Sequence, residues 1–434
     1  MNTYLYAPKD DLKHRALWRE PYAPEEAEAL RRLIDDARRH RLRFIYALAP
    51  GLDVRYGDPA ELDHLARRLE QMIGLGCRDF ALLFDDIPDR LHAEDRARWP
   101  SFAEAQCDLT SRLFAWTRAR APGGRFLFCP TPYCGRMAER GLGGAGYLET
   151  VGRLLPREID VFWTGPEIIS REIPVGHLRE VAAWLRRKPL LWDNLHANDY
   201  DGRRFFCGPY SGRAPELRNE VSGILINPNT EFPLNHVPLQ TCAEFARGGG
   251  PWNPREAYLR ALRDWLPHFA TVGQAIAFED LVLLGDAYYL PHEDGPEAQA
   301  LFASAQALLG TDPATWDSGA IEAFRGRATR LRECCARLAE LRDRPLFYAL
   351  SRRVWELREE LDLLLGYVRL MSDRTGAVTP ARSDFHLPGT YRGGFVSRLQ
   401  QLLEQHPDGT FTAALTRTPS TQPGGAVPSV GPTS

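Results

Sequence analysis

The chain has 434 residues, of which 44% are hydrophobic and 26% charged, and its net charge is -3. This composition supplies enough apolar side chains for folded cores and excludes wholesale disorder. The length suits two or three domains, or one large barrel with an appendage. The near balance of charge argues against a nucleic-acid partner, and no apolar run approaches the roughly 18 residues that a membrane span needs.

The cysteines and the N-terminal residues indicate the cellular compartment in which the chain is expected. None of the eight cysteines forms a CxxC pair or has zinc-finger spacing, which favours reduced, buried thiols. Residues 3–7 already have the character of a strand, with no basic and then apolar leader before them. As given, the chain is expected to be cytoplasmic. A start inside a strand also favours a further upstream segment, which would allow a secreted protein.

Short apolar runs alternate with helical patterns over the first 250 residues. The runs are rich in aromatic residues, as expected of strands buried on both faces. Asp58 followed by Pro59 marks the start of one helix, with Glu61 placed to complete a capping box. The alternation predicts a parallel sheet with helical crossovers. The runs lie at 3–7, 44–49, 80–84, 126–129, 161–163, 190–192 and 224–226.

The number of strand–helix units indicates the fold class. A (β/α)8 barrel has eight units in ~250 residues, and this chain has about one fewer. We therefore predict an α/β fold, a TIM barrel that lacks its first β/α unit, followed by an all-α helical domain. The missing unit reflects either a misassigned start or a real loss that leaves unpaired strand edges. An open doubly wound sheet is the competing fold, without a GxGxxG turn to support it.

The second half of the chain has a different pattern. Strand signals stop after residue 250, and helical spacing of apolar residues recurs near 254–290, 296–309, 318–342 and 345–372. From residue 406 the chain is rich in Pro, Gly, Ser and Thr. The predicted domains are accordingly a barrel at 1–250, a helical bundle at 251–405 and a disordered tail at 406–434.

Polar residues follow each of the predicted strands. In a barrel the carboxyl ends of the strands carry the active site, so these residues are expected on one face. Several such endings suit a polar, neutral ligand such as a sugar, because aromatic rings pack on its C–H surfaces and amides or carboxylates bond its hydroxyls. The candidates are Lys9, Asp85, Asp86, Tyr133, Trp192, Asn194, Asp199, Tyr200 and Asn227.

Asp85 and Asp86 are the sharpest feature. Adjacent carboxylates directly after an apolar run are costly near a core, and both reach one ligand only if the strand breaks there. Crowded carboxylates repel, so one of them gains a raised pKa and can serve as a general acid. A solvated turn with an N-cap aspartate is the structural alternative, and these two residues alone do not decide between the two.

The same residues permit a metal-dependent alternative. Residues 85–89 match the DDxxD pattern of isoprenoid synthases that bind magnesium diphosphate. That motif belongs on a helix of an all-α fold, whereas here a strand-like run precedes it and Pro88 interrupts it. This alternative is therefore disfavoured.

Six motifs occur in one order along the chain: YAPKDD at 6–11, FALLFDDI at 80–87, FCPT at 128–131, WTGP at 163–166, WDNLHANDYD at 192–201 and NPN at 227–229. Together they resemble glycoside hydrolase family 84, the β-N-acetylglucosaminidases that include protein O-GlcNAcases and bacterial relatives. The resemblance covers residues 1–245, and the helical region is more weakly similar to the helical domain of bacterial members. The family's Glu-Gly-Phe-Tyr-Gly-like first-strand motif is absent.

The resemblance implies a retaining exo-β-N-acetylglucosaminidase that removes terminal β-linked N-acetylglucosamine from glycoproteins or other glycoconjugates. The 2-acetamido oxygen of the substrate forms an oxazoline, so no enzyme nucleophile is needed, unlike in the usual two-carboxylate scheme. Asp85 would orient the acetamido N–H, and Asp86 would be the general acid and then the base. No metal or organic cofactor is implied.

The resemblance also implies roles for the other candidates. Asn194 would bind the acetamido group, and Asp199 the O4 and O6 hydroxyls. The remaining positions are Lys9 and Asn227 on the sugar, Tyr133 near the leaving oxygen, Cys129 and Trp192 in the pocket wall, and Tyr200 on the aglycone side.

Two questions stay open at this point. A GlcNAc-binding pseudoenzyme, inactivated by loss of the first barrel unit, is the alternative to an enzyme, although the retained catalytic-type residues favour the enzyme. The helical region suits either a homodimer interface or a surface for protein aglycones, and its pattern does not choose between them.

Overall fold

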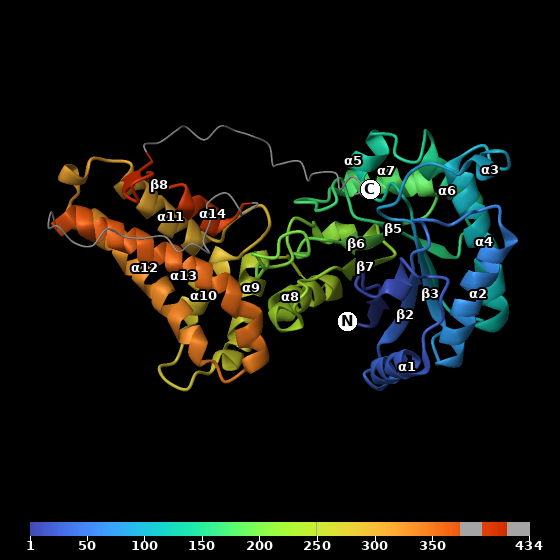
Figure 1. Ribbon diagram of the computed structural model, residues 1–434, viewed down its shortest axis with the longest axis horizontal. Helices are drawn as coiled ribbons and strands as arrows, with labels where there is room; N and C mark the ends of the chain where they lie inside the picture. The colour runs from blue at the N-terminus through green and yellow to red at the C-terminus, as the bar shows by residue number, and fades with distance from the viewer. Residues whose placement is uncertain (249, 374–392, 415–434) are drawn as a thin grey trace. The chain divides into compact units, whose positions relative to one another are not determined.

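The computed structural model describes residues 1–248, 250–373 and 393–414, and these residues form two compact units (Figure 1). Unit 1 comprises Met1–Ala197, Pro209–Pro228 and Pro238–Ala257. Unit 2 comprises Asn198–Gly208, Asn229–Val237 and the described residues from Tyr258 onward. The units are therefore not continuous in sequence, because two loops of the strand-rich half belong to unit 2.

Unit 1 is built on a parallel sheet of seven strands that neighbour one another in chain order. The register aligns their carboxyl ends, since Leu48 pairs with Leu82 and Leu83 pairs with Cys129. Among the described residues, the first and last strands each pair on one side only. The strands are β1 (Thr3–Tyr6), β2 (Arg43–Leu48), β3 (Asp79–Leu83), β4 (Phe126–Cys129), β5 (Ile159–Trp163), β6 (Leu190–Asp193) and β7 (Gly223–Ile226).

This topology decides between the two predicted folds. A doubly wound sheet reverses its strand order at a switch point, whereas the order here runs from β1 to β7 without reversal. The doubly wound alternative is therefore wrong. The predicted barrel-type α/β fold, with a strand at each of the seven expected runs, is confirmed.

The helices of unit 1 follow the strands and pack beside them (Figure 1). The start predicted for the second helix is confirmed, because the Asp58 side chain accepts a hydrogen bond from the Ala60 N–H. The capping box is not formed, since the Glu61 carboxylate pairs instead with Arg19, at 2.6 Å. The helices are η1 (Leu12–His14), α1 (Pro24–Arg39), α2 (Pro59–Gly74), α3 (Ala93–Arg96), α4 (Phe102–Arg120), α5 (Gly135–Glu139), α6 (Tyr147–Leu154), α7 (Val175–Leu185) and η2 (Pro215–Asn219).

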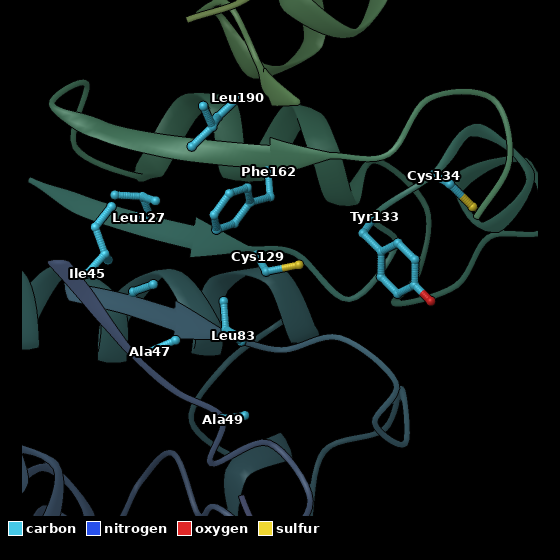
Figure 2. Packing of buried hydrophobic residues seen from close by; sticks show 11 residues of the cluster. Ile45, Ala47, Ala49, Leu83, Leu127, Cys129, Tyr133, Cys134, Phe162 and Leu190 are labelled. Atoms are coloured by element: carbon cyan, nitrogen blue, oxygen red, sulfur yellow. The ribbon is translucent and has the colours of Figure 1, made fainter. Parts of the chain in front are cut away.

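The core of unit 1 explains why its strands are apolar throughout. Side chains on one face of the sheet, such as Ala47, Leu83 and Leu127, pack against one another in a single cluster. Side chains on the other face of the sheet pack on helices. At the carboxyl ends of the strands this core continues into Cys129 and Tyr133 (Figure 2). The core therefore leads directly to the candidate site residues.

Unit 2 is helical, and neighbouring helices of the series α10 to α13 pack on one another (Figure 1). The longest helix has an apolar stripe at helical spacing, Val354, Leu357, Leu361, Leu364, Leu365 and Val368. All of these are buried except Leu365, which is partly exposed. Its elements are η3 (Phe232–Asn235), η4 (Leu266–Phe269), α10 (Phe278–Ala287), α11 (Pro296–Leu309), η5 (Pro313–Thr315), α12 (Ser318–Arg337), η6 (Leu338–Glu340), α13 (Arg344–Asp373), α14 (Phe395–Gln400), β8 (Leu403–Gln405) and β9 (Phe411–Ala413), while α8 (His236–Arg247) and α9 (Pro254–Trp265) contain residues of both units.

Two predicted segments reach beyond the described residues. The tail expected from residue 406 begins inside the antiparallel pair β8 and β9, and residues 415–434 lie outside the described part of the chain. Residues 374–392, which fall within the predicted bundle, also lie outside it. No described helix is both long enough and apolar enough to cross a membrane.

Candidate active site

The adjacent carboxylates lie where strand β3 breaks. The strand ends at Leu83, and the Phe84 N–H still donates to the Cys129 carbonyl, at 3.0 Å. Asp86 then has a φ of 51°, a left-handed conformation that costs roughly 1–3 kcal/mol for a residue other than glycine. The motif at 85–89 thus follows a strand of an α/β unit, and it is not on the helix that the metal-diphosphate alternative requires.

Asp85 is the more buried of the pair. Its side chain is 18% exposed, and its Oδ1 has no hydrogen-bond partner among the described residues. Its Oδ2 lies 3.9 Å from Lys9 Nζ and 3.8 Å from Arg15 Nη1. Burial, and then the neighbouring charge of Asp86, raise the pKa of Asp85 above its ordinary value.

Asp86 has a different environment. Its side chain is 44% exposed, Lys9 Nζ lies 2.8 Å from its Oδ2, and the Tyr133 hydroxyl donates to its Oδ1 at 2.7 Å. Burial alone would raise the pKa of Asp86, but the Lys9 charge and the hydrogen bonds from Lys9 and Tyr133 outweigh it and lower that pKa. The pKa values are therefore split, as predicted, but the raised one belongs to Asp85 and not to the expected general acid.

Tyr133 is held in place by Thr164, which directly follows strand β5. Its carbonyl accepts hydrogen bonds from the Thr164 N–H, at 2.9 Å, and from the Thr164 hydroxyl, at 3.3 Å. The ring is 7% exposed and lies at the carboxyl end of the core beside Cys129 (Figure 2). Burial raises the pKa of the Cys129 thiol well above its ordinary value, and the role predicted for it in a pocket wall stays a prediction. Trp192, at the next strand, packs edge-to-face on Phe162 with centroids 5.0 Å apart.

The two candidate asparagines meet at the ends of β6 and β7. Asn227 Nδ2 donates to Asn194 Oδ1 at 3.1 Å, and Asn194 Nδ2 donates to the Ile168 carbonyl at 2.8 Å. The Asn227 N–H also bonds the Asp193 carbonyl, at 2.8 Å, which continues the ladder between the strands. These contacts fix the orientation of both amides at the polar end of the sheet.

A buried ion pair that the sequence did not reveal lies directly before Asn194. Asp193 Oδ1 and Oδ2 accept from Arg213 at 2.6 and 2.7 Å, and the two side chains are 1% and 0% exposed. Tyr210 donates a further hydrogen bond to Asp193 at 2.7 Å. The pair joins the β6 end to the segment after Pro209 and so supports the asparagine that follows it.

The predicted residues divide between the units. Asp199, which is exposed, and Tyr200, which stacks on Phe206, belong to unit 2, and the roles predicted for them stay predictions. Arg15, in unit 1, contacts the aspartate pair and was not among the predicted site residues. No motif or spacing in the sequence connects it with Asp85, which lies 70 positions later. The candidates at the polar end of unit 1 are Lys9, Asp85, Asp86, Cys129, Tyr133, Trp192, Asn194 and Asn227.

A barrel-type sheet with a carboxylate pair, paired amides and aromatic side chains at the carboxyl ends of its strands suits a glycoside hydrolase. Comparison with known sequences agrees, because the profile of the beta-N-acetylglucosaminidase family matches residues 1–278. The chain belongs to this family, and the predicted resemblance is confirmed.

Similar proteins include the Protein O-GlcNAcases of Rattus norvegicus and Mus musculus, each 49% identical over 243 residues. The match covers 56% of this chain and 26% of each relative, so the chain spans about a quarter of their length. Among solved structures, a mutant of the Thermobaculum terrenum O-GlcNAc hydrolase has a TM-score of 0.75 and 29% identity, and the match covers 87% of this chain and 79% of that one. The fold thus extends over most of both chains.

Proposed function

We propose that this chain is a retaining exo-β-N-acetylglucosaminidase that hydrolyses terminal β-linked N-acetylglucosamine from glycoproteins or other glycoconjugates. The main support for this proposal is the pair of aspartates at the end of β3, whose side chains differ in burial and in hydrogen bonding. Asp85 is largely buried and keeps one carboxylate oxygen without a partner among the described residues, while Asp86 is half-exposed beside it. The pair thus offers an acceptor for an amide N–H next to a group that can exchange a proton with a glycosidic oxygen.

The chemistry follows from these two environments. The acetamido oxygen attacks the anomeric carbon, the bond to the leaving oxygen breaks, and Asp86 gives its proton to that oxygen. Asp85 accepts the hydrogen bond of the acetamido N–H and stabilises the positive charge of the oxazolinium ring. Asp86 then takes a proton from the water that attacks the anomeric carbon, so two inversions retain the β configuration.

The protonation of Asp86 requires a change on binding. Lys9, at 2.8 Å, lowers the pKa of Asp86, whereas a general acid must carry a proton. The Lys9 side chain is 57% exposed and can turn toward a sugar hydroxyl. Removal of its charge from Asp86 then raises the pKa of that carboxyl when the substrate is in place. Asn194 and Asn227, which bond each other, supply donors and acceptors for the same sugar.

The test is turnover of aryl β-N-acetylglucosaminides without added metal. Asp86→Asn should lower kcat on a poor leaving group by about 10²–10⁴, as loss of a general acid does, and much less on a good one. Asp89→Asn is the matched control, because Asp89 lies in the same loop and is exposed. Equal losses in both variants would contradict the role of Asp86.

The substrate-assisted step has its own test. Replacing the N-acetyl group by N-trifluoroacetyl weakens the acyl oxygen as a nucleophile, so the rate should fall steeply. Asp85→Asn should damage only substrates that carry an acetamido group. Equal rates of the wild-type chain on the N-acetylglucosaminide and on a glucoside without that group would refute the oxazoline route. A folded chain that binds N-acetylglucosamine without any turnover would support the pseudoenzyme instead.

A further inference from the structure

Arg15 contacts both members of the aspartate pair through their backbone. Its Nη2 donates to the Asp86 carbonyl at 2.6 Å and approaches the Asp85 carbonyl at 3.3 Å. Its Nη1 lies 3.8 Å from Asp85 Oδ2. We propose that Arg15 is a positioning residue that holds the left-handed turn between the two aspartates and so aims both carboxylates. This inference rests on the proposed function for its kinetic readouts.

The first argument is the strain in the turn. Asp86, at a φ of 51°, adopts a conformation that persists only where the surroundings hold it. The ladder with β4 ends at the pair Leu83 and Cys129, so the carbonyls of Asp85 and Asp86 lie beyond its last registered pair. Arg15 supplies their donors, and a charged donor makes a stronger hydrogen bond than a neutral one. The guanidinium therefore stabilises the strained backbone at the point where the strand breaks.

The second argument is that Arg15 is itself firmly anchored. The ring of the preceding His14 is 2% exposed and its Nδ1 bonds the Ala47 carbonyl at 2.9 Å. The Lys13 carbonyl accepts from Arg68 Nη1 at 2.8 Å. These bonds tie the segment to β2 and α2, so it presents the guanidinium from a rigid support, as precise positioning requires.

The third argument is the contrast between the two cations. The Lys9 side chain is 57% exposed, whereas that of Arg15 is only 15% exposed. Lys9 can therefore move to a substrate while Arg15 stays. The charge of Arg15 lowers the pKa of Asp85 and of Asp86, although in each case burial is the larger influence and raises the pKa. Loss of Arg15 should move both pKa values upward.

The kinetic test uses Arg15→Gln, Arg15→Lys and the control Arg19→Gln. Arg19 lies in the same segment but pairs with Asp53 and Glu61. Misplacement of the aspartates by about 1 Å should lower kcat on a poor leaving group by about 10²-fold, with KM changed less than about 3-fold. Arg15→Lys should be nearly as slow, because a single ammonium cannot replace both Nη2, which faces the two carbonyls, and Nη1, which faces the Asp85 carboxylate. The optimum of kcat/KM should move to higher pH in Arg15→Gln.

The outcomes separate this inference from the proposed function. Wild-type kcat in Arg15→Gln, full rescue by Arg15→Lys, or equal losses in Arg15→Gln and Arg19→Gln would each overturn the positioning role. If the wild-type chain does not turn over, the proposed function fails and a crystal structure of Arg15→Gln decides the inference by itself. Departure of Asp86 from the left-handed region would support it, and an unchanged turn would refute it.

Discussion

The ion pair between Asp193 and Arg213 offers a prediction whose magnitude can be worked from the structure. Arg213→Met removes both hydrogen bonds to Asp193 and those to the carbonyls of Ser170, Arg171 and Ser211, each at 2.9 Å. The carboxylate left behind is 1% exposed. Stranding one partner of a buried pair costs about 3–5 kcal/mol, because the remaining charge stays desolvated.

Thermal and urea unfolding of the full chain provide the assay. At roughly 2–4 °C per kcal/mol for a domain of 150–250 residues, Arg213→Met should lower the Tm of unit 1 by about 6–20 °C. Adding Asp193→Asn should recover part of this loss, because it removes the stranded charge. The control is Arg179→Gln, which breaks the ion pair between Arg179 and Glu220. The Arg179 side chain is 65% exposed, so this substitution should lower the free energy of unfolding by less than about 1 kcal/mol. Equal destabilisation in Arg213→Met and Arg179→Gln would refute the reasoning.

Two further predictions concern the loops that carry the site. Tyr133→Phe removes a hydrogen bond that lowers the pKa of Asp86, so the pKa of Asp86 should rise. Because a general acid must be protonated, the alkaline limb of the kcat/KM profile should move to higher pH. An unmoved limb would exclude Asp86 as the general acid. Gly165→Ala should destabilise unit 1 by more than about 1 kcal/mol, because φ is 107° and a Cβ would lie 2.5 Å from Ser170 Oγ. Gly176→Ala, in open space on α7, should instead be neutral or stabilising in the same unfolding assay.

The fold of unit 1 could be predicted because its signals are local. Each strand is a short apolar run bounded by polar residues, and strands buried on both faces need such runs. Asp58 and Pro59 marked a helix start from two adjacent residues, and the structure has that cap. The prediction that Glu61 completes the cap is wrong because its actual partner, Arg19, lies 42 positions earlier and only the fold brings the two together.

The aspartate pair could be singled out from sequence, since adjacent carboxylates directly after a buried strand are costly near a core, but only the surrounding family motifs favoured a site over a solvated turn. Which of the two has the higher pKa could not be predicted. Asp86 is ionised more readily because Lys9 and Tyr133, 77 and 47 positions away, contact it, while Asp85 lies deeper. The contacts of Arg15 and Arg213 could not be predicted either, because their partners are also distant in the sequence. Hydrophobic periodicity is a property of neighbours along the chain, whereas a pKa or a strained turn depends on burial and on charges within a few ångströms, which only the tertiary structure brings together.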